Sequence, residues 1–157
     1  MIRFAIVQWR MNNDKWVATQ SANSKKISMS IFGQNIQDKC MHFAVRIVNL
    51  CHFLTEEKHE FNISNQVFRS GTSIGANIAE AQCAISKKDF INKVYIALKE
   101  NNETIYWLEL LYKTHYIVKK QYDSIYTDAD ELRRLLVSIT KTARKNEENN
   151  CSIAENK

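Results

Sequence analysis

The residues of this chain that come nearest to a metal site are Glu56 and His59, which have the spacing Glu-x-x-His. A di-iron centre in a helical bundle needs two such pairs and two further glutamates, all facing the inside of the bundle. The sequence contains one pair, in a charged segment that we predict to be a loop. His42, His52 and His115 stand alone, as core or surface histidines do. We therefore expect no metal ion.

Most catalytic motifs of the common kinds are missing from the sequence. It contains no P-loop, no H-E-x-x-H and no glycine-rich dinucleotide-binding turn. Gly71-Thr-Ser-Ile-Gly75 has the letters of G-x-S-x-G, but it lies inside a segment with helical period and not at the strand-to-helix turn that such a nucleophile needs. We expect a protein without enzymatic activity and without a cofactor.

The cysteines and the apolar segments indicate where in the cell the protein is expected. Cys40, Cys51, Cys83 and Cys151 are far apart and form no C-x-x-C pair, so no disulfide framework is indicated. No apolar run reaches the length of about 18 residues that a membrane-spanning helix needs. The apolar start of the chain is too short and too interrupted for a signal peptide. We expect a cytoplasmic protein with no membrane association.

Small residues recur at every fourth position of the segment 69–80, at Gly71, Gly75 and Ala79. On a helix they form a flat ridge that a neighbouring helix can approach closely. Because a glycine inside a helix costs about 1 kcal/mol relative to alanine, tight packing must compensate for it. That packing lies either within one molecule or between protomers, and the sequence leaves both open.

Polar residues accompany this ridge. Ser70, Ser73 and Asn77 share one helical face, and a later helical segment carries Glu100 and Asn101 in its middle. Buried polar groups that meet between helices fix register and oligomeric state at some cost in stability. A catalytic carboxylate site is the alternative use of these positions. The residues that we assign to packing or assembly are Gly71, Ser73, Gly75, Asn77, Glu80, Glu100 and Trp107.

Aromatic rings are concentrated in one short stretch, at Tyr106, Trp107, Tyr112, His115 and Tyr116. Exposed rings on a basic surface can stack nucleic-acid bases. Packing against the core is the interpretation that we favour. Because Trp107 stands beside the apolar stripe of its segment, we expect it at a helix boundary or in an oligomer interface.

The elements that must position these residues are helices. The chain has no proline and only three glycines, which favours long uninterrupted helices. Apolar residues step by threes and fours along four segments, at about 36–54, 63–81, 86–113 and 127–143. Ser86 with Asp89, and Thr127 with Asp130, have the types and spacing of helix-capping pairs and predict the starts of the last two helices.

Four amphipathic helices with short connections pack most simply as antiparallel neighbours. We therefore predict an all-α protein, an antiparallel up-down four-helix bundle over residues 35–146. Residues 1–34 show no helical period and are interpreted as a poorly ordered N-terminal extension, and residues 147–157 as a polar C-terminal tail. Met29 stands where the period begins, so a start of the natural protein at this residue is an open alternative.

The net charge of +5 is unevenly distributed along the chain. Residues 1–28 hold five basic residues and one acidic residue, whereas the rest holds 17 basic and 16 acidic residues. Antiparallel packing nevertheless gathers basic residues at the end of the bundle where the third helix starts and the fourth ends. The candidates for nucleic-acid binding there are Lys87, Lys88, Lys93, Lys141, Arg144 and Lys145. Phosphate binding at this end would be salt-sensitive and largely independent of base sequence. The alternative is a solvated, lysine-rich helix end.

Several motif blocks, in order and at matching separation, carry a resemblance to a known family. The main blocks are Arg69-Ser-Gly-Thr-Ser-Ile-Gly-Ala-Asn-Ile-Ala-Glu80, Ser86-Lys-Lys-Asp-Phe90, Ile96-Ala-Leu-Lys-Glu100 and Tyr106-Trp-Leu108. Over residues 36–144 the chain resembles the bacterial four-helix bundle proteins associated with intervening sequences of 23S ribosomal RNA. It departs from many members by Ala81 in place of a glycine and by its N-terminal extension.

The resemblance implies an up-down four-helix bundle without enzymatic activity. Better understood relatives form homopentamers. A related branch, the accessory protein of diversity-generating retroelements, binds a reverse transcriptase and nucleic acid through basic surface. We therefore expect a homo-oligomeric accessory protein that binds RNA, DNA or a reverse transcriptase-like partner. The alternative is a purely protein-binding scaffold with no nucleic-acid role.

Overall fold

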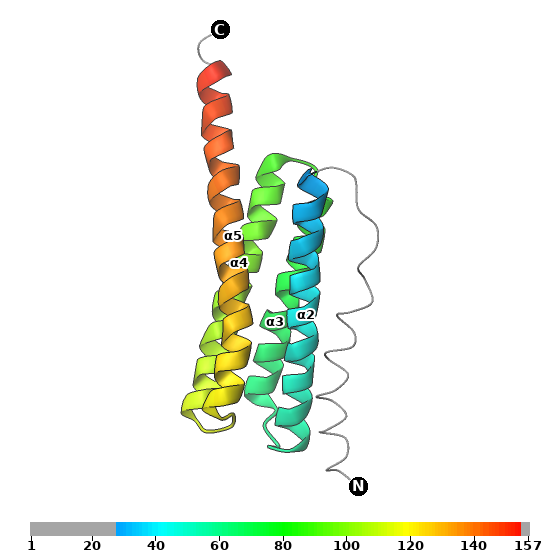
Figure 1. Ribbon diagram of the computed structural model, residues 1–157, viewed down its shortest axis with the longest axis vertical. Coiled ribbons are helices and arrows are strands. Elements are labelled where there is room, and N and C mark those ends of the chain that lie inside the picture. The colour runs from blue at the N-terminus through cyan, green and yellow to red at the C-terminus, as the bar shows by residue number, and fades with distance from the viewer. Residues whose placement is uncertain (1–27, 155–157) are drawn as a thin grey trace. The chain divides into compact units, whose positions relative to one another are not determined.

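A computed structural model describes the backbone of residues 28–154 and the side chains of residues 35–144. These residues form four helices and no strand (Figure 1). The helices are α2 (Ser28–Glu56), α3 (Asn62–Gln82), α4 (Lys87–Lys113) and α5 (Lys119–Ala154). The predicted all-α class is confirmed. None of these helices combines the length and the apolar character that crossing a bilayer requires.

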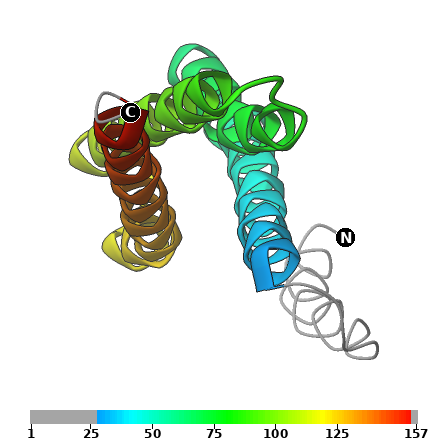
Figure 2. The ribbon, with the colours of Figure 1, turned by 90° about the horizontal axis from the view of Figure 1, so that it is seen from above.

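The four helices pack as an up-down bundle. In the view of Figure 2, α3 and α4 lie side by side, and α2 and α5 flank them. Short loops join consecutive helices, so neighbours in the chain run antiparallel. An ion pair between Lys39 Nζ of α2 and Glu131 Oε1 of α5, at 2.7 Å, connects the first helix to the last. The predicted bundle topology is therefore confirmed.

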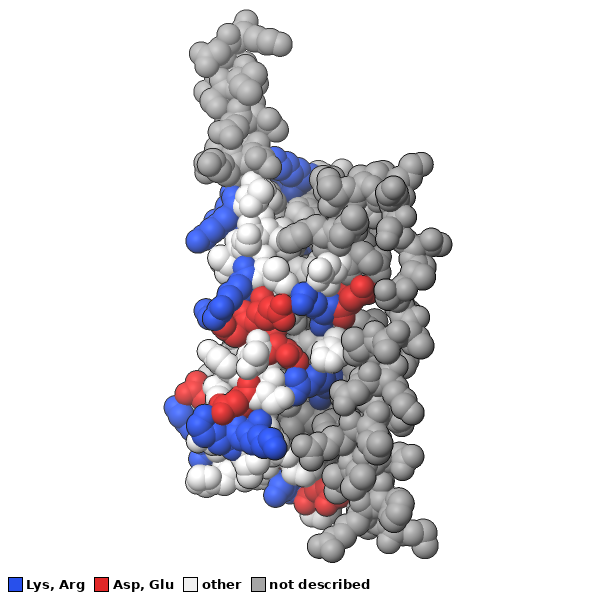
Figure 3. All heavy atoms as spheres, in the orientation of Figure 1, with Lys and Arg blue, Asp and Glu red and all other residues white. Residues whose placement is uncertain are grey.

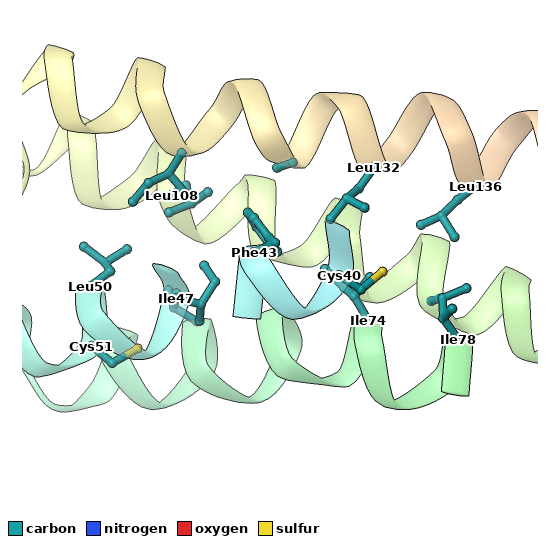
Figure 4. Close-up of a cluster of buried hydrophobic side chains, with 14 of the residues drawn as sticks. Cys40, Phe43, Ile47, Leu50, Cys51, Ile74, Ile78, Leu108, Leu132 and Leu136 are labelled. Atoms are coloured by element: carbon teal, nitrogen blue, oxygen red, sulfur yellow. The ribbon is translucent and has the colours of Figure 1, made fainter. Parts of the chain in front are cut away.

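The core forms where the apolar stripes of the four helices meet. Figure 4 shows Leu108 of α4 and Leu132 of α5 facing Phe43 of α2 across the interior. Burying a leucine, isoleucine or phenylalanine side chain contributes about 1.5–3 kcal/mol, so these stripes account for the packing of the helices. All the stripe residues predicted for the first helix are buried: Ile36, Cys40, Phe43, Ile47, Leu50, Cys51 and Leu54.

Side chains satisfy the free backbone N–H groups at the starts of α3 and α4. Ser86 Oγ accepts a hydrogen bond from Asp89 N at 3.1 Å, and Asp89 Oδ2 accepts one from Ile85 N at 3.3 Å, as predicted for the capping pair. At α3 the carboxylate of Glu60 accepts hydrogen bonds from the backbone N–H groups of Asn62, Ile63 and Ser64, at 2.7–3.0 Å. Glu60 is buried although the charged segment around it is solvated.

The start predicted for the last helix at Thr127 is wrong. Helix α5 begins at Lys119, and Thr127 lies inside it, with its Oγ1 donating to the carbonyl of Asp123 at 2.7 Å. The helix extends upstream because Ile125 and Ala129 are buried and continue the apolar stripe. The actual start is stabilised by Gln121 Oε1, which accepts a hydrogen bond from Val118 N at 2.9 Å.

The first and last helices extend beyond the bounds predicted for the bundle. Helix α2 begins at Ser28 and α5 ends at Ala154, so residues 28–34 and 147–154, assigned to the extension and the tail, are helical. Residues 1–27 lie outside the described residues. Their predicted disorder and the alternative start at Met29 therefore stay predictions.

Candidate nucleic-acid interface

The glycines of the small-residue ridge lie against α2 inside the bundle. A Cβ atom at Gly71 would lie 2.8 Å from both Cγ atoms of Ile47, which is closer than side chains can approach, whereas one at Gly75 would lie 3.5 Å from Cβ of Cys40. Ala79, the third member of the ridge, is exposed. The close approach of helices that the sequence predicts is therefore made by α2 and α3 of one molecule.

The polar residues beside the ridge divide between two kinds of contact. Ser70 of α3 and Thr104 of α4 are both buried, and their hydroxyl oxygens lie 2.9 Å apart. By contrast, Asn77 Nδ2 donates to the carbonyl of Ser73 within its own helix, at 2.8 Å. The sequence analysis missed Thr104, although its spacing from the buried Ala97 and Leu108 places it on the core stripe.

Asn101 of α4 is a fully buried polar side chain, like Thr104 on the same helix. Its Nδ2 donates to the carbonyl of Ala129 on α5 at 2.9 Å, which ties these two helices together. Its Oδ1 is buried and has no hydrogen-bond partner among the described residues. Glu100, the neighbouring carboxylate, is half-buried, and this burial, with a smaller contribution from Glu103, raises its pKa. Arg69 opposes that rise in the pKa.

The aromatic residues predicted as one cluster separate into two groups. Trp107 packs partly against the core and donates from Nε1 to Glu103 Oε1 at 3.1 Å. The ring of Tyr106 meets Trp107 edge-on and is 58% exposed. Tyr112 instead stacks on Tyr122 of α5, with 5.0 Å between ring centroids. None of these contacts places a ring beside the basic end of the bundle.

The pair Glu56 and His59 also separates. Glu56 ends α2, whereas His59 is exposed in the following loop with a backbone φ of 52°. Among the described residues, no group of three or more His, Cys, Asp or Glu side chains is placed to hold a metal ion.

One of the predicted cations, Lys93, is neutralised by a neighbouring carboxylate, and so is Arg46 of α2. Lys93 of α4 forms an ion pair with Glu80 of α3, and this hydrogen bond raises the pKa of Lys93. Arg46 of α2 is held by Asp128 and by the hydroxyl of Ser124. These two cations stabilise helix contacts and offer less charge to a ligand.

The other cations at the upper end of the bundle are free of such partners. Lys87, Lys88, Lys141 and Arg144 are exposed, and none of them pairs with a carboxylate among the side chains of residues 35–144. The side chain of Lys145 lies outside that range. Among the side chains that Figure 3 colours, the upper part of this face shows Lys and Arg, whereas both signs of charge occur below. We call Lys87, Lys88, Lys141 and Arg144 the basic end.

A tyrosine that was not predicted as a site residue lies beside Arg144 of the basic end. Tyr95 of α4 is 41% exposed, with Lys99 Nζ at 5.2 Å and Arg144 Cζ at 5.7 Å from its ring centroid. The ring lines a surface hollow together with Lys88 and Asn92. The site is apparent only from the contact between α4 and α5, because Tyr95 and Arg144 are far apart in the sequence.

Comparisons with known proteins place this fold in a family. The sequence profile described as "23S rRNA-intervening sequence protein" matches residues 34–138. The chain is also similar to a crystal structure of a protein with unknown function from the S23 ribosomal protein family of Bacteroides thetaiotaomicron. The two are 58% identical, with a TM-score of 0.69, over 70% of this chain and 98% of the other. No curated protein is significantly similar to the chain.

Proposed function

The chain belongs to the 23S rRNA-intervening sequence protein family, and we propose that it is a non-enzymatic, homo-oligomeric accessory protein that binds nucleic acid through its basic end. The observation that carries this proposal is the contrast between cations. Lys39, Arg46 and Lys93 are held in ion pairs between helices. The four cations of the basic end are exposed and unpaired among the described side chains.

Unpaired surface cations bind phosphates by releasing the counterions of the nucleic acid, so their binding weakens steeply as salt rises. The residues from Met29 onward hold nearly equal numbers of basic and acidic residues. A local patch, and not the net charge of the bundle, must then attract the phosphates. In a ring of several chains the same patch would recur around the assembly and strengthen the attraction. A cytoplasmic location belongs to this proposal, since RNA, DNA or a reverse transcriptase-like partner would be met there.

Charge reversal in the full chain tests the proposal. The variant Lys87→Glu, Lys88→Glu, Lys141→Glu, Arg144→Glu should lose at least tenfold in affinity for RNA and DNA at low salt. The matched control reverses four cations at the opposite end, Lys58, Lys113, Lys119 and Lys120, and changes the net charge equally. Fluorescence anisotropy measures both. Equal affinities of the two variants would contradict binding at the basic end.

The N-terminal segment needs its own comparison, because residues 1–28 carry five basic residues and one acidic residue. A chain that begins at Met29 and the full chain are titrated with the same labelled RNA. Binding by the bundle predicts that both keep the sensitivity to charge reversal. Loss of all binding in the shorter chain would assign the nucleic acid to the extension.

A protein-binding scaffold is the second candidate, favoured by exposed apolar residues on the other side of the bundle. Met41 is 60% exposed and Val45 44%, and they stand one turn apart on α2. Phe68 of α3 is 44% exposed and, with His52 of α2, lines a hollow of about 220 Å³. Such side chains favour contact with protein over contact with nucleic acid. A chain that assembles but binds no nucleic acid at low salt would support this candidate.

A further inference from the structure

A surface hollow that is open to solvent lies at the basic end. Its volume is about 440 Å³, and it lies between the first turns of α4 and Arg144 of α5. Pockets for small ligands span about 300–1,000 Å³. The groups that matter here are Lys88, Asp89, Asn92, Tyr95 and Arg144.

Tyr95 provides a flat apolar wall in this hollow. Its ring is 41% exposed, although most apolar and aromatic residues of α4 pack on the core. The ammonium of Lys99 and the guanidinium of Arg144 both lie within 6 Å of the ring centroid, at 5.2 and 5.7 Å. Cation–π contacts at this range hold the ring in place. A base that stacks on the exposed part of the ring would take the place of one of these cations over the ring face, and both positive charges would stay beside the base.

Some polar groups of the hollow suit a nucleic-acid base, and others suit its phosphates. The carboxylate of Asp89 is half-buried and accepts a hydrogen bond from Ile85 N, so it repels a phosphate and can accept an N–H of a base. The amide of Asn92 offers both a donor and an acceptor. Lys88 and Arg144, which are exposed, are the groups that attract phosphate.

From this arrangement we propose that the hollow holds one unpaired base of a single-stranded nucleic acid, stacked on Tyr95, with its flanking phosphates bound by Lys88 and Arg144. The inference rests on the proposed function and names its ligand class. In a duplex the bases are stacked on each other and their faces are not accessible. Aromatic side chains in basic grooves therefore select single strands, with little preference for base sequence.

The test compares variants of Tyr95 in the full chain, titrated with a short labelled single strand and with the duplex of the same sequence. Tyr95→Leu removes the stacking face and should weaken single-strand binding about five- to 150-fold, the effect of losing one stacked base. Duplex affinity and the salt dependence should stay unchanged, because the phosphate contacts remain. Tyr95→Phe keeps the ring and should bind within twofold of the unchanged protein. Tyr106→Leu, an exposed tyrosine elsewhere on α4, is the matched control and should have no effect.

A second readout does not depend on the stability of a variant. A single strand that carries 5-iodouracil is cross-linked by light to the unchanged protein, and the attached peptide is identified by mass spectrometry. We expect attachment at Tyr95. Attachment elsewhere would contradict the stacking.

The outcomes separate the inference from the proposed function. If Tyr95→Leu binds the single strand like the unchanged protein while charge reversal weakens binding, the base site is wrong and the basic end stands. If Tyr95→Leu weakens single strand and duplex equally, Tyr95 only positions Arg144, and the inference is also wrong. If the unchanged protein binds neither strand at low salt, the proposed function and the inference fail together. Titrating RNA and DNA single strands separately shows which of the two nucleic acids the hollow binds.

Discussion

Gly71 is the residue at which α3 approaches α2 most tightly among the glycines of the bundle. The atoms that a new Cβ would meet are the two Cγ atoms of Ile47, at 2.8 Å. These atoms are attached directly to Cβ of a β-branched side chain, which has little freedom to turn away. Gly75, one turn later, has ordinary space, with the nearest atom of Cys40 at 3.5 Å.

Alanine at these two positions should therefore have opposite effects on stability. Overpacking costs about 1–3 kcal/mol, and replacing a helical glycine by alanine gains about 1 kcal/mol. Gly71→Ala should lower the free energy of unfolding by up to about 2 kcal/mol, while Gly75→Ala should leave it unchanged or raise it by up to about 1 kcal/mol. Urea unfolding followed by circular dichroism measures both. Stabilisation by Gly71→Ala would mean that the helices are further apart.

For single residues, the sequence predicts contacts between side chains that are a few positions apart in the chain. The pair Ser86 and Asp89 was predictable because a capping pair is defined by residue type and spacing alone. The contact of Thr104 with Ser70 and the approach of Arg144 to Tyr95 join different helices. They depend on the register between helices, which residue types alone do not specify.

Among the elements, α2 shows how well a helical stripe predicts burial. Its two cysteines lie on that stripe and are buried, at 1% and 6% exposure for Cys40 and Cys51. Burial raises the pKa of Cys40 to about 12 and also raises the pKa of Cys51. Cys83, just after α3, is exposed.

Thiol labelling should therefore distinguish the cysteines by element. The thiolate is the reactive form, and at pH 8 a buried thiol with a raised pKa is both less ionised and less accessible. In a Cys151→Ser background, a disulfide reagent should label Cys83 rapidly. Cys40 and Cys51 should react at least a hundredfold more slowly, and at the rate of Cys83 once the protein is unfolded in urea. Equal rates in the folded protein would contradict the burial of the α2 stripe.

The ends of the elements were less predictable than their stripes. Thr127 and Asp130 satisfy the capping pattern, but the buried Ile125 and Ala129 extend α5 upstream of them. Gln121 then supplies the hydrogen bond to Val118 at the actual start. A polar pair can occur anywhere on a helix surface, so burial on both sides of it decides whether a helix starts there.

At the scale of the whole molecule, we predict that several copies of the chain assemble, as proposed above. The exposed Val45 and Phe68 favour contact with further protein. Light scattering coupled to gel filtration should give a mass several times that of one chain. Val45→Glu with Phe68→Glu should shift the protein to the monomer, because charges buried at an interface without partners are strongly unfavourable.

The control for this prediction is Thr127→Glu, which adds a charge at an exposed position of α5 and should leave the assembly intact. An unchanged protein that is monomeric at the highest concentration tested would contradict assembly. It would leave single-chain binding of nucleic acid in place, since the basic end lies within one chain.

Binding at the basic end is tested by the salt dependence of single-stranded RNA binding, measured for the full chain and for the variant with charges reversed at Lys87, Lys88, Lys141 and Arg144. The affinity should fall linearly on logarithmic axes, by about 0.7 in slope for each phosphate bound on a single strand. We predict that charge reversal reduces that slope by about 1 to 3, whereas reversal at the opposite end leaves it unchanged. An identical slope for all three proteins, or binding that does not depend on salt, would contradict the basic end as a nucleic-acid interface.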